Sequence, residues 1–163
     1  MKAMRQTASI LVVLVLTVAV SAAQDAPAPP AASPGPSDIE NLKAAVEKAP
    51  RGQQGKLYAE LAERLVNIAN QQFTGGKSTE AQATVQEVLQ CSIKAHDLAL
   101  STRKNRKEIE ISLRQTQRHL EDMKHTLAAE DRPPVDAVEK KLGDLRQELL
   151  DALFGPNPKK EGK

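Results

Sequence analysis

The sequence predicts an all-α protein, a four-helix chain arranged in antiparallel helical hairpins. Aromatic residues make up only 2% of the chain, whereas strands are rich in aromatic and β-branched side chains. Apolar residues recur at steps of three and four, the period of an amphipathic helix. Proline and glycine stand mainly between these periodic segments, where they end helices.

The first segment, residues 1–23, has the pattern of a secretory signal peptide. Lys2 and Arg5 precede an apolar run over residues 10–20, and small residues follow at 21–23. This run is shorter than the roughly 18 to 20 residues that span a bilayer. We therefore expect cleavage rather than an uncleaved membrane anchor, no stable membrane span afterwards, and a periplasmic or secreted protein.

Two further segments are predicted to be disordered. Residues 24–36 consist mostly of alanine, proline and serine and form a predicted linker. Residues 155–163 contain two prolines and three lysines and form a predicted basic tail. The helical domain is therefore expected over residues 37–154.

The first two helices are expected at residues 37–48 and 53–73. Ser37 and Glu40 have the spacing of a capping box at a helix start, and Pro50 interrupts the helical pattern. The glycine pair at residues 75–76 ends the second helix. Its apolar face is formed by Leu57, Leu61, Leu65, Ile68 and Ala69.

The third helix is expected to be long, because residues 77–131 contain neither proline nor glycine. Ser78 or Thr79, the latter with Gln82, is predicted to cap it. About 50 helical residues would extend roughly 75 Å, and a rod of that length would need a partner to complete its packing. The seam is apolar at both ends but small, polar or charged in the middle, so a continuous helix and a bend near residues 101–107 both remain open. Its positions are Ala81, Val85, Val88, Ser92, Ala95, Ala99, Thr102, Arg106, Ile109, Leu113, Thr116, Leu120, Met123 and Leu127.

The fourth helix is expected to begin at about Val135, after the prolines in residues 131–134 end the third. Its length matches the seam over residues 109–127 and the connection is short, which favours an antiparallel hairpin with heptad-like, coiled-coil contacts. The seam consists of Val135, Val138, Leu142, Leu145, Leu149 and Ala152.

Residues 61–89 resemble the helix pair of a single tetratricopeptide repeat. The positions that carry the resemblance are Ala69, Phe73, Gly76, Ala81 and Ala83. Members of that family are helical scaffolds that bind peptides and partner proteins, which is what the resemblance implies here. The segment lacks the tryptophan, the following proline and a second copy. The whole layout is also similar to small secreted bacterial helical proteins, a similarity that implies no activity.

Signatures of common catalytic and cofactor sites are missing from the sequence. It has no nucleophile elbow, zinc-protease helix or paired-cysteine motif. The run Gly76-Lys77-Ser78 lacks the first glycine of a phosphate-binding loop, because position 71 is Gln71. We therefore predict that the chain is not an enzyme and carries no cofactor.

Histidine and cysteine side chains leave a few alternatives open. Glu121 and His125 are four residues apart on a helix and could hold a metal ion with Asp122. His96 is expected to pack among apolar side chains. Cys91 is the only cysteine, so it is either a small buried hydrophobe or a free thiol that could cross-link two chains.

A dense basic run suggests an interaction surface at Arg103, Lys104, Arg106 and Lys107. Carboxylates follow within the same segment, so the run could be a self-paired, solvated helix face or could meet an anionic partner. No aromatic side chain accompanies it to stack on bases, and the chain without its leader has balanced charge. We therefore expect no nucleic-acid partner.

Two functional hypotheses remain. The first is a non-catalytic helical interaction or scaffold protein of the bacterial cell envelope, whose partner is another protein or a second copy of itself. The second is a helical module that binds a small ligand or a metal ion in the periplasm. A reproducible protein partner would favour the first, and a bound ligand would favour the second.

Overall fold

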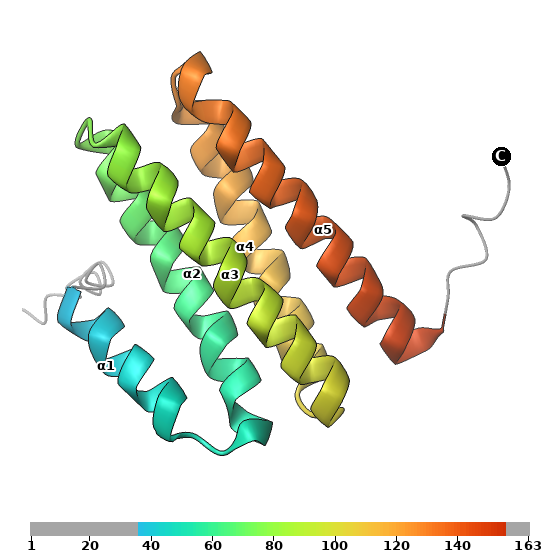
Figure 1. Ribbon diagram of the computed structural model, residues 1–163. Helices are drawn as coiled ribbons and strands as arrows, with labels where there is room; N and C mark the ends of the chain where they lie inside the picture. Colours follow the sequence, from blue (N-terminus) through green and yellow to red (C-terminus); the bar gives the residue numbers. More distant parts are fainter. Residues whose placement is uncertain (1–35, 156–163) are drawn as a thin grey trace, which may run out of the picture. The chain divides into compact units, whose positions relative to one another are not determined.

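The computed structural model describes residues 36–155, which are almost entirely helical (Figure 1). No strand occurs in this range, so the all-α prediction is confirmed. The predicted signal peptide, nearly all of the predicted linker and the basic tail beyond residue 155 lie outside the described residues. The elements are α1 (Pro36–Lys48), α2 (Arg51–Thr74), α3 (Ser78–Thr102), α4 (Arg106–Thr126), the 3₁₀ turn η1 (Ala129–Asp131) and α5 (Arg132–Phe154).

Of the two alternatives for the predicted third helix, the interruption near residues 101–107 is confirmed, because α3 ends at Thr102 and α4 begins at Arg106. The described range therefore contains five helices, and the prediction of four is wrong. Arg103 and Asn105 lie between α3 and α4 with φ angles of 57° and 55°, a left-handed conformation that cannot continue a helix. Asparagine adopts it more readily than most residues. The seam offers little apolar area here to hold a straight helix against a neighbour. Because the break lets both halves of the seam join one core, the argument that a long rod needs a partner no longer applies.

The seam itself is largely confirmed. On α3 and α4 every predicted position is buried except Thr102 and Arg106, which are half-buried beside the break. On α5 the positions from Val135 to Leu149 are buried, whereas Ala152 is exposed. The helical period in the sequence therefore identifies the buried face on both sides of the break between α3 and α4.

The start of α5 differs from the prediction, because Pro133 and Pro134 lie inside the first turn of the helix. Residues in a first turn donate no intrahelical hydrogen bond, so proline is tolerated there. The chain leaves the helical conformation earlier, at Leu127, where φ is −81° and ψ is 150°. The turn η1 then leads directly into α5.

The predicted side-chain cap of the third helix is wrong. Lys77 occupies the N-cap position of α3 and makes no capping hydrogen bond. The Ser78 hydroxyl instead donates to Asp131 Oδ2 at 2.9 Å, and Gln82 Nε2 donates to Asp131 Oδ1 at 3.0 Å. Both side chains therefore tie α3 to η1, because the carboxylate is a stronger acceptor than a neutral group.

The core consists of two apolar clusters. The larger contains Ile39, Leu65, Val88, Leu120 and Leu142 among others, and the smaller contains Ala59, Ala95, Ala99, Ile109, Leu113, Leu145 and Leu149. Ser92 and Thr116 lie between the clusters and are fully buried. Each hydroxyl donates to a carbonyl of its own helix, Val88 O at 2.8 Å and Ser112 O at 2.9 Å. The two buried hydroxyl groups therefore have hydrogen-bond acceptors within their own helices.

Candidate functional site

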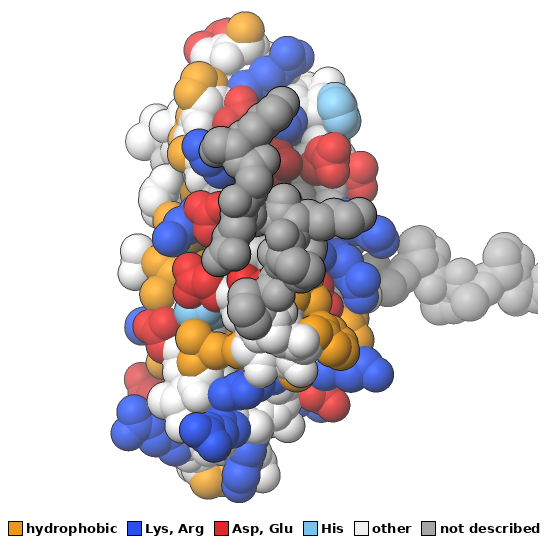
Figure 2. Space-filling view, turned by 90° about the vertical axis from the view of Figure 1, so that its right-hand side faces the viewer, with side chains coloured by type: hydrophobic (Ala, Val, Ile, Leu, Met, Phe, Trp, Pro, Cys, Tyr) orange, Lys and Arg blue, Asp and Glu red, His pale blue; other side chains and the backbone are white. Residues whose placement is uncertain are grey.

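The turn between α3 and α4 carries the four basic residues singled out in the sequence. Arg103, Lys104 and Lys107 are exposed, whereas Arg106 is half-buried. In the space-filling view Lys and Arg side chains gather at the lower end of the visible face, where this turn lies in Figure 1 (Figure 2). The four residues thus divide into three that present their charge to solvent and one that does not.

Arg106 binds the ends of two other helices. Its Nε donates to Ala99 O at 3.2 Å and its Nη2 to Leu100 O at 3.3 Å, both in the last turn of α3. Its Nη1 donates to Ala152 O near the end of α5 at 3.1 Å. The carbonyls at a helix C-terminus carry partial negative charge, so the guanidinium neutralises it. Arg106 is therefore a structural residue of this end.

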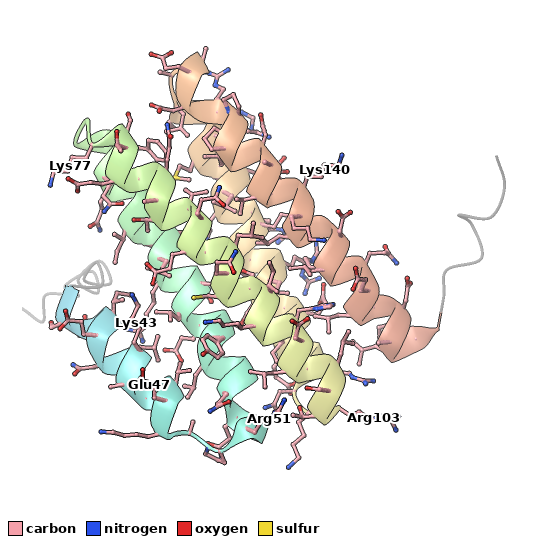
Figure 3. All side chains as sticks on the ribbon, in the orientation of Figure 1. Lys43, Glu47, Arg51, Lys77, Arg103 and Lys140 are labelled. Carbon is pink, nitrogen blue, oxygen red and sulfur yellow. The ribbon has the colours of Figure 1, made fainter. Side chains whose placement is uncertain are left out.

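The start of α2 lies beside the same turn. Asn105 Nδ2 donates to Gly52 O at 3.1 Å, and a Cβ added at Gly52 would lie 2.9 Å from Lys104 Cδ. The Lys104 side chain thus lies against the backbone of Gly52. Arg51, the first residue of α2, is exposed, and Figure 3 places it at the same end as Arg103. We call the exposed side chains of Arg51, Arg103, Lys104 and Lys107 the basic end.

No carboxylate among residues 36–155 lies within ion-pair distance of the basic end, whereas several other cations of the bundle have carboxylate partners. Lys124, for comparison, contacts Asp136 at 2.9 Å and Glu139 at 2.7 Å. Hydrogen bonds to these two carboxylates raise the pKa of the Lys124 ammonium above its usual range. The charges of the basic end are not satisfied in this way.

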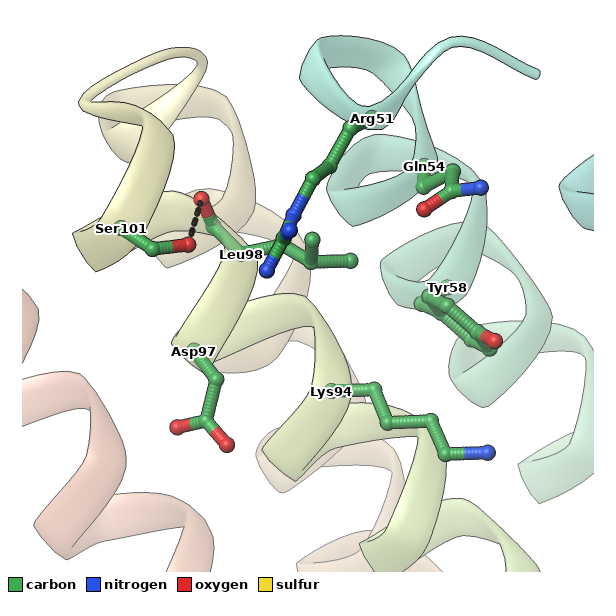
Figure 4. Close-up of a pocket in the computed structure, with 7 residues that line it drawn as sticks. All are labelled: Arg51, Gln54, Tyr58, Lys94, Asp97, Leu98 and Ser101. Atoms are coloured by element: carbon green, nitrogen blue, oxygen red, sulfur yellow. Dashed lines mark hydrogen bonds between the residues drawn. The ribbon is translucent and has the colours of Figure 1, made fainter.

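An open groove of about 580 Å³ extends from the basic end between α2 and α3 (Figure 4). Arg51, Tyr58, Lys94 and Leu98 line it, and the Lys94 ammonium lies 5.2 Å from the centre of the Tyr58 ring. We call this hollow the α2–α3 groove. Nothing in the sequence around Arg51 and Lys94 indicates a site, because each is an isolated cation that only the packing of α2 on α3 brings near the basic run.

Three polar residues also line the α2–α3 groove. The Gln54 amide donates to Ala49 O at 3.1 Å, and the Ser101 hydroxyl donates to Leu98 O at 3.4 Å. Asp97 Oδ1 lies 3.0 Å from His96 Nδ1. All three polar side chains therefore have partners within the bundle.

His96 joins α3 to α5 and is almost completely buried. Glu148 Oε2 of α5 lies 3.1 Å from Nε2, although Nε2 makes no hydrogen bond in the described bundle. The ring is buried, as predicted, but its two nitrogens lie beside carboxylates and not only among apolar side chains.

Cys91 is buried in the larger apolar cluster. Burial, reinforced by the negative charge of Glu87, raises the pKa of its thiol to about 11. The thiolate is the reactive form of cysteine, so this environment makes Cys91 unreactive at neutral pH. Of the two alternatives, the structure favours the small buried hydrophobe.

The candidate metal ligands do not form a site in the described residues. Glu121, Asp122 and His125 are exposed on α4, and nowhere in residues 36–155 do three histidine, cysteine or acidic side chains converge. The glycine pair ends α2, with Gly75 N donating to Gln71 O at 2.9 Å. Its role in the structure is that of a helix-ending turn.

Comparison with protein-family models, with curated proteins and with solved structures gives no match. Within the described range, no helix has the length and apolar character needed to cross a bilayer.

Proposed function

We propose that the chain is a non-catalytic interaction or scaffold protein of the bacterial cell envelope that contacts an anionic partner protein through its basic end. One observation carries the proposal: two turns far apart in the sequence bring four exposed cations together, and no carboxylate of the described bundle pairs with them. Unpaired surface charge of one sign steers a partner of the opposite sign and fixes its orientation. The bundle then acts as the rigid support for this surface.

The helix pairs supply that rigidity. Arg106 at the start of α4 contacts Ala152 at the end of α5, and Lys124 near the end of α4 contacts Glu139 near the start of α5. These contacts support an antiparallel hairpin of α4 and α5. We also propose that α2 and α3 resemble the helix pair of a single tetratricopeptide repeat.

Placement in the envelope rests on the leader at residues 1–23 and is tested separately. The exported protein should begin at Ala23 or Gln24, because small residues flank both cleavage points. Intact-mass measurement of the protein from a periplasmic fraction decides this. A chain that retains Met1 in the membrane fraction would contradict export with cleavage.

Capture from envelope extract tests the interaction. The mature chain and a variant with Arg51, Arg103, Lys104 and Lys107 changed to glutamine are immobilised in parallel. A matched control changes Lys140 and Lys141 on α5, which are exposed and unpaired in the described bundle, to glutamine. We expect the mature chain and the control to retain one acidic protein, and the variant to lose it. Equal capture by all three would contradict the proposal.

A further inference from the structure

We propose that the α2–α3 groove is the docking track for an acidic amphipathic segment of the partner protein. The segment's apolar side chains would lie on Tyr58 and Leu98, and its carboxylates would meet Arg51 and Lys94. This inference rests on the proposed function and specifies which surface and which kind of segment carry it.

The first argument is the polar balance of the groove. Gln54, Asp97 and Ser101 are engaged inside the bundle, as described above, and Figure 4 shows Asp97 directed away from Lys94. Arg51 and Lys94 remain, and no carboxylate in residues 36–155 pairs with either. Arg51 and Lys94 are therefore the groove side chains without an anionic partner, and an anion that accepts hydrogen bonds from a guanidinium and an ammonium would complete them.

The second argument is the apolar character between these two cations. Tyr58 and Leu98 are half-buried, so each keeps apolar surface accessible within the groove. An inorganic anion or a simple polyanion would leave that surface uncovered. A segment that alternates acidic and apolar side chains would cover the surface and pair the charges together.

The third argument is continuity with the basic end. Arg51 lines the groove and also belongs to the basic end, and the Lys104 side chain lies over Gly52, the next residue of α2. α2 and α4 both begin here, and helix N-termini add partial positive charge. The partial negative charge of the α3 and α5 carbonyls is bound by Arg106. A segment that leaves the groove at Arg51 thus continues onto the cations of the basic end.

The chain carries its own reporter for this site. Tyr58 is the only tyrosine and tryptophan is absent, so the fluorescence of the protein excited near 280 nm comes from the groove. The probe is a synthetic peptide of leucine and glutamate at helical spacing without aromatic residues. The matched peptide has lysine in place of each glutamate.

We expect the acidic peptide to change Tyr58 emission with a saturable dose dependence, and the lysine peptide to leave it unchanged. Changing Arg51 and Lys94 together to glutamine should weaken binding about tenfold, since two exposed charge pairs are lost and each contributes only modestly. The Lys140 and Lys141 double change should leave the affinity as it is. Circular dichroism checks that all variants keep their helices.

Equal binding of both peptides, or equal affinity of the Arg51 and Lys94 variant, would overturn the docking track. The capture experiment distinguishes this failure from failure of the proposed function. If the acidic partner is still captured through Arg103, Lys104 and Lys107 while Tyr58 does not respond, the interaction stands and the groove is not its site.

Discussion

The α2–α3 pair and the α4–α5 pair differ in how their helices are joined. About half of the buried residues of α2 and α3 are small, and the others include Leu61, Leu65 and Val88. The small ones are Gly55, Ala59, Ala62, Ala69, Ala81, Ala95 and Ala99. A Cβ added at Gly55 would lie 3.4 Å from Ala95 O and 3.2 Å from Leu98 Cβ. The two backbones therefore approach closely at Gly55, where the interface leaves no room for a larger side chain.

Between α4 and α5 the buried residues are large, and charged groups join the helices. Leu113, Leu120, Leu142 and Leu149 are completely buried. Glu110, whose side chain is 8% exposed, accepts hydrogen bonds from Arg146 at 3.0 and 3.2 Å. This interface needs both volume and charge partners, so the two pairs should fail under opposite kinds of substitution.

The largest effect is expected for a charge placed in the α4–α5 seam. Leu145→Asp, or Leu120→Asp, should lower the free energy of unfolding by about 4 kcal/mol or leave the pair unfolded, because an unpaired carboxylate would be buried. Urea unfolding followed by circular dichroism measures it. Lys140→Ala, on the exposed face of α5, should stay within about 0.5 kcal/mol. Wild-type stability of Leu145→Asp would show that the seam is wrong.

Removing a charge partner comes next. Arg146→Ala should cost about 3 kcal/mol, because it leaves the Glu110 carboxylate buried without its main donor. Arg114→Ala is the control, since Arg114 is more exposed and lies 3.9 Å from Glu110; it should cost under about 1 kcal/mol. Replacing Glu110 and Arg146 together by leucine should recover most of the loss. If the double replacement costs more than Arg146→Ala alone, the ion pair itself holds the helices.

Alkaline pH should weaken the half of the bundle that contains Cys91. The unfolded thiol loses its proton near pH 9, whereas the folded thiol keeps it until about pH 11. Over this window the folded state binds more protons, so the free energy of unfolding falls as pH rises, by roughly 2 to 3 kcal/mol at most. Below pH 9 this contribution is constant. Unfolding of the wild type and of Cys91→Ala at pH 8 to 11 isolates the effect, and parallel pH profiles would contradict it.

Added volume should give a smaller effect, concentrated in the α2–α3 pair. Gly55→Val should cost about 2 kcal/mol, because its Cβ would lie 3.0 Å from Ile109 Cδ1 and close to α3. The matched Gly143→Val on α5 should stay within about 0.5 kcal/mol, since only Gln117 Nε2 lies near, at 3.4 Å. Thermal melts of both variants compare the two interfaces directly. Equal losses would mean that close approach does not distinguish α2–α3.

Periodicity and local chemistry were enough to predict the class of fold and most of the buried face. The step of three and four residues depends only on helix geometry, so positions such as Val85, Leu113 and Leu142 could be assigned from the sequence. The ends of α1 and α2 near Pro50 and Gly75 were also predictable, because proline and glycine limit the backbone locally.

Tertiary structure decided the rest. Whether the chain broke at residues 103–105 depended on the core that the break allows α4 to join, and Asn105 only makes the left-handed turn accessible. Ser78 and Gln82 had equally plausible local roles, and Asp131 of a distant turn determined their partner. Arg51 and Lys94 lie near the basic run because α2 packs closely on α3, a contact between residues far apart in the sequence. Arg106 belongs to the run in the sequence, but its side chain binds helix carbonyls. A local sequence pattern reflects the conformational propensities of neighbouring residues. The break, the partners of Ser78 and Gln82 and the position of Arg106 depend instead on contacts with groups that are distant in the sequence.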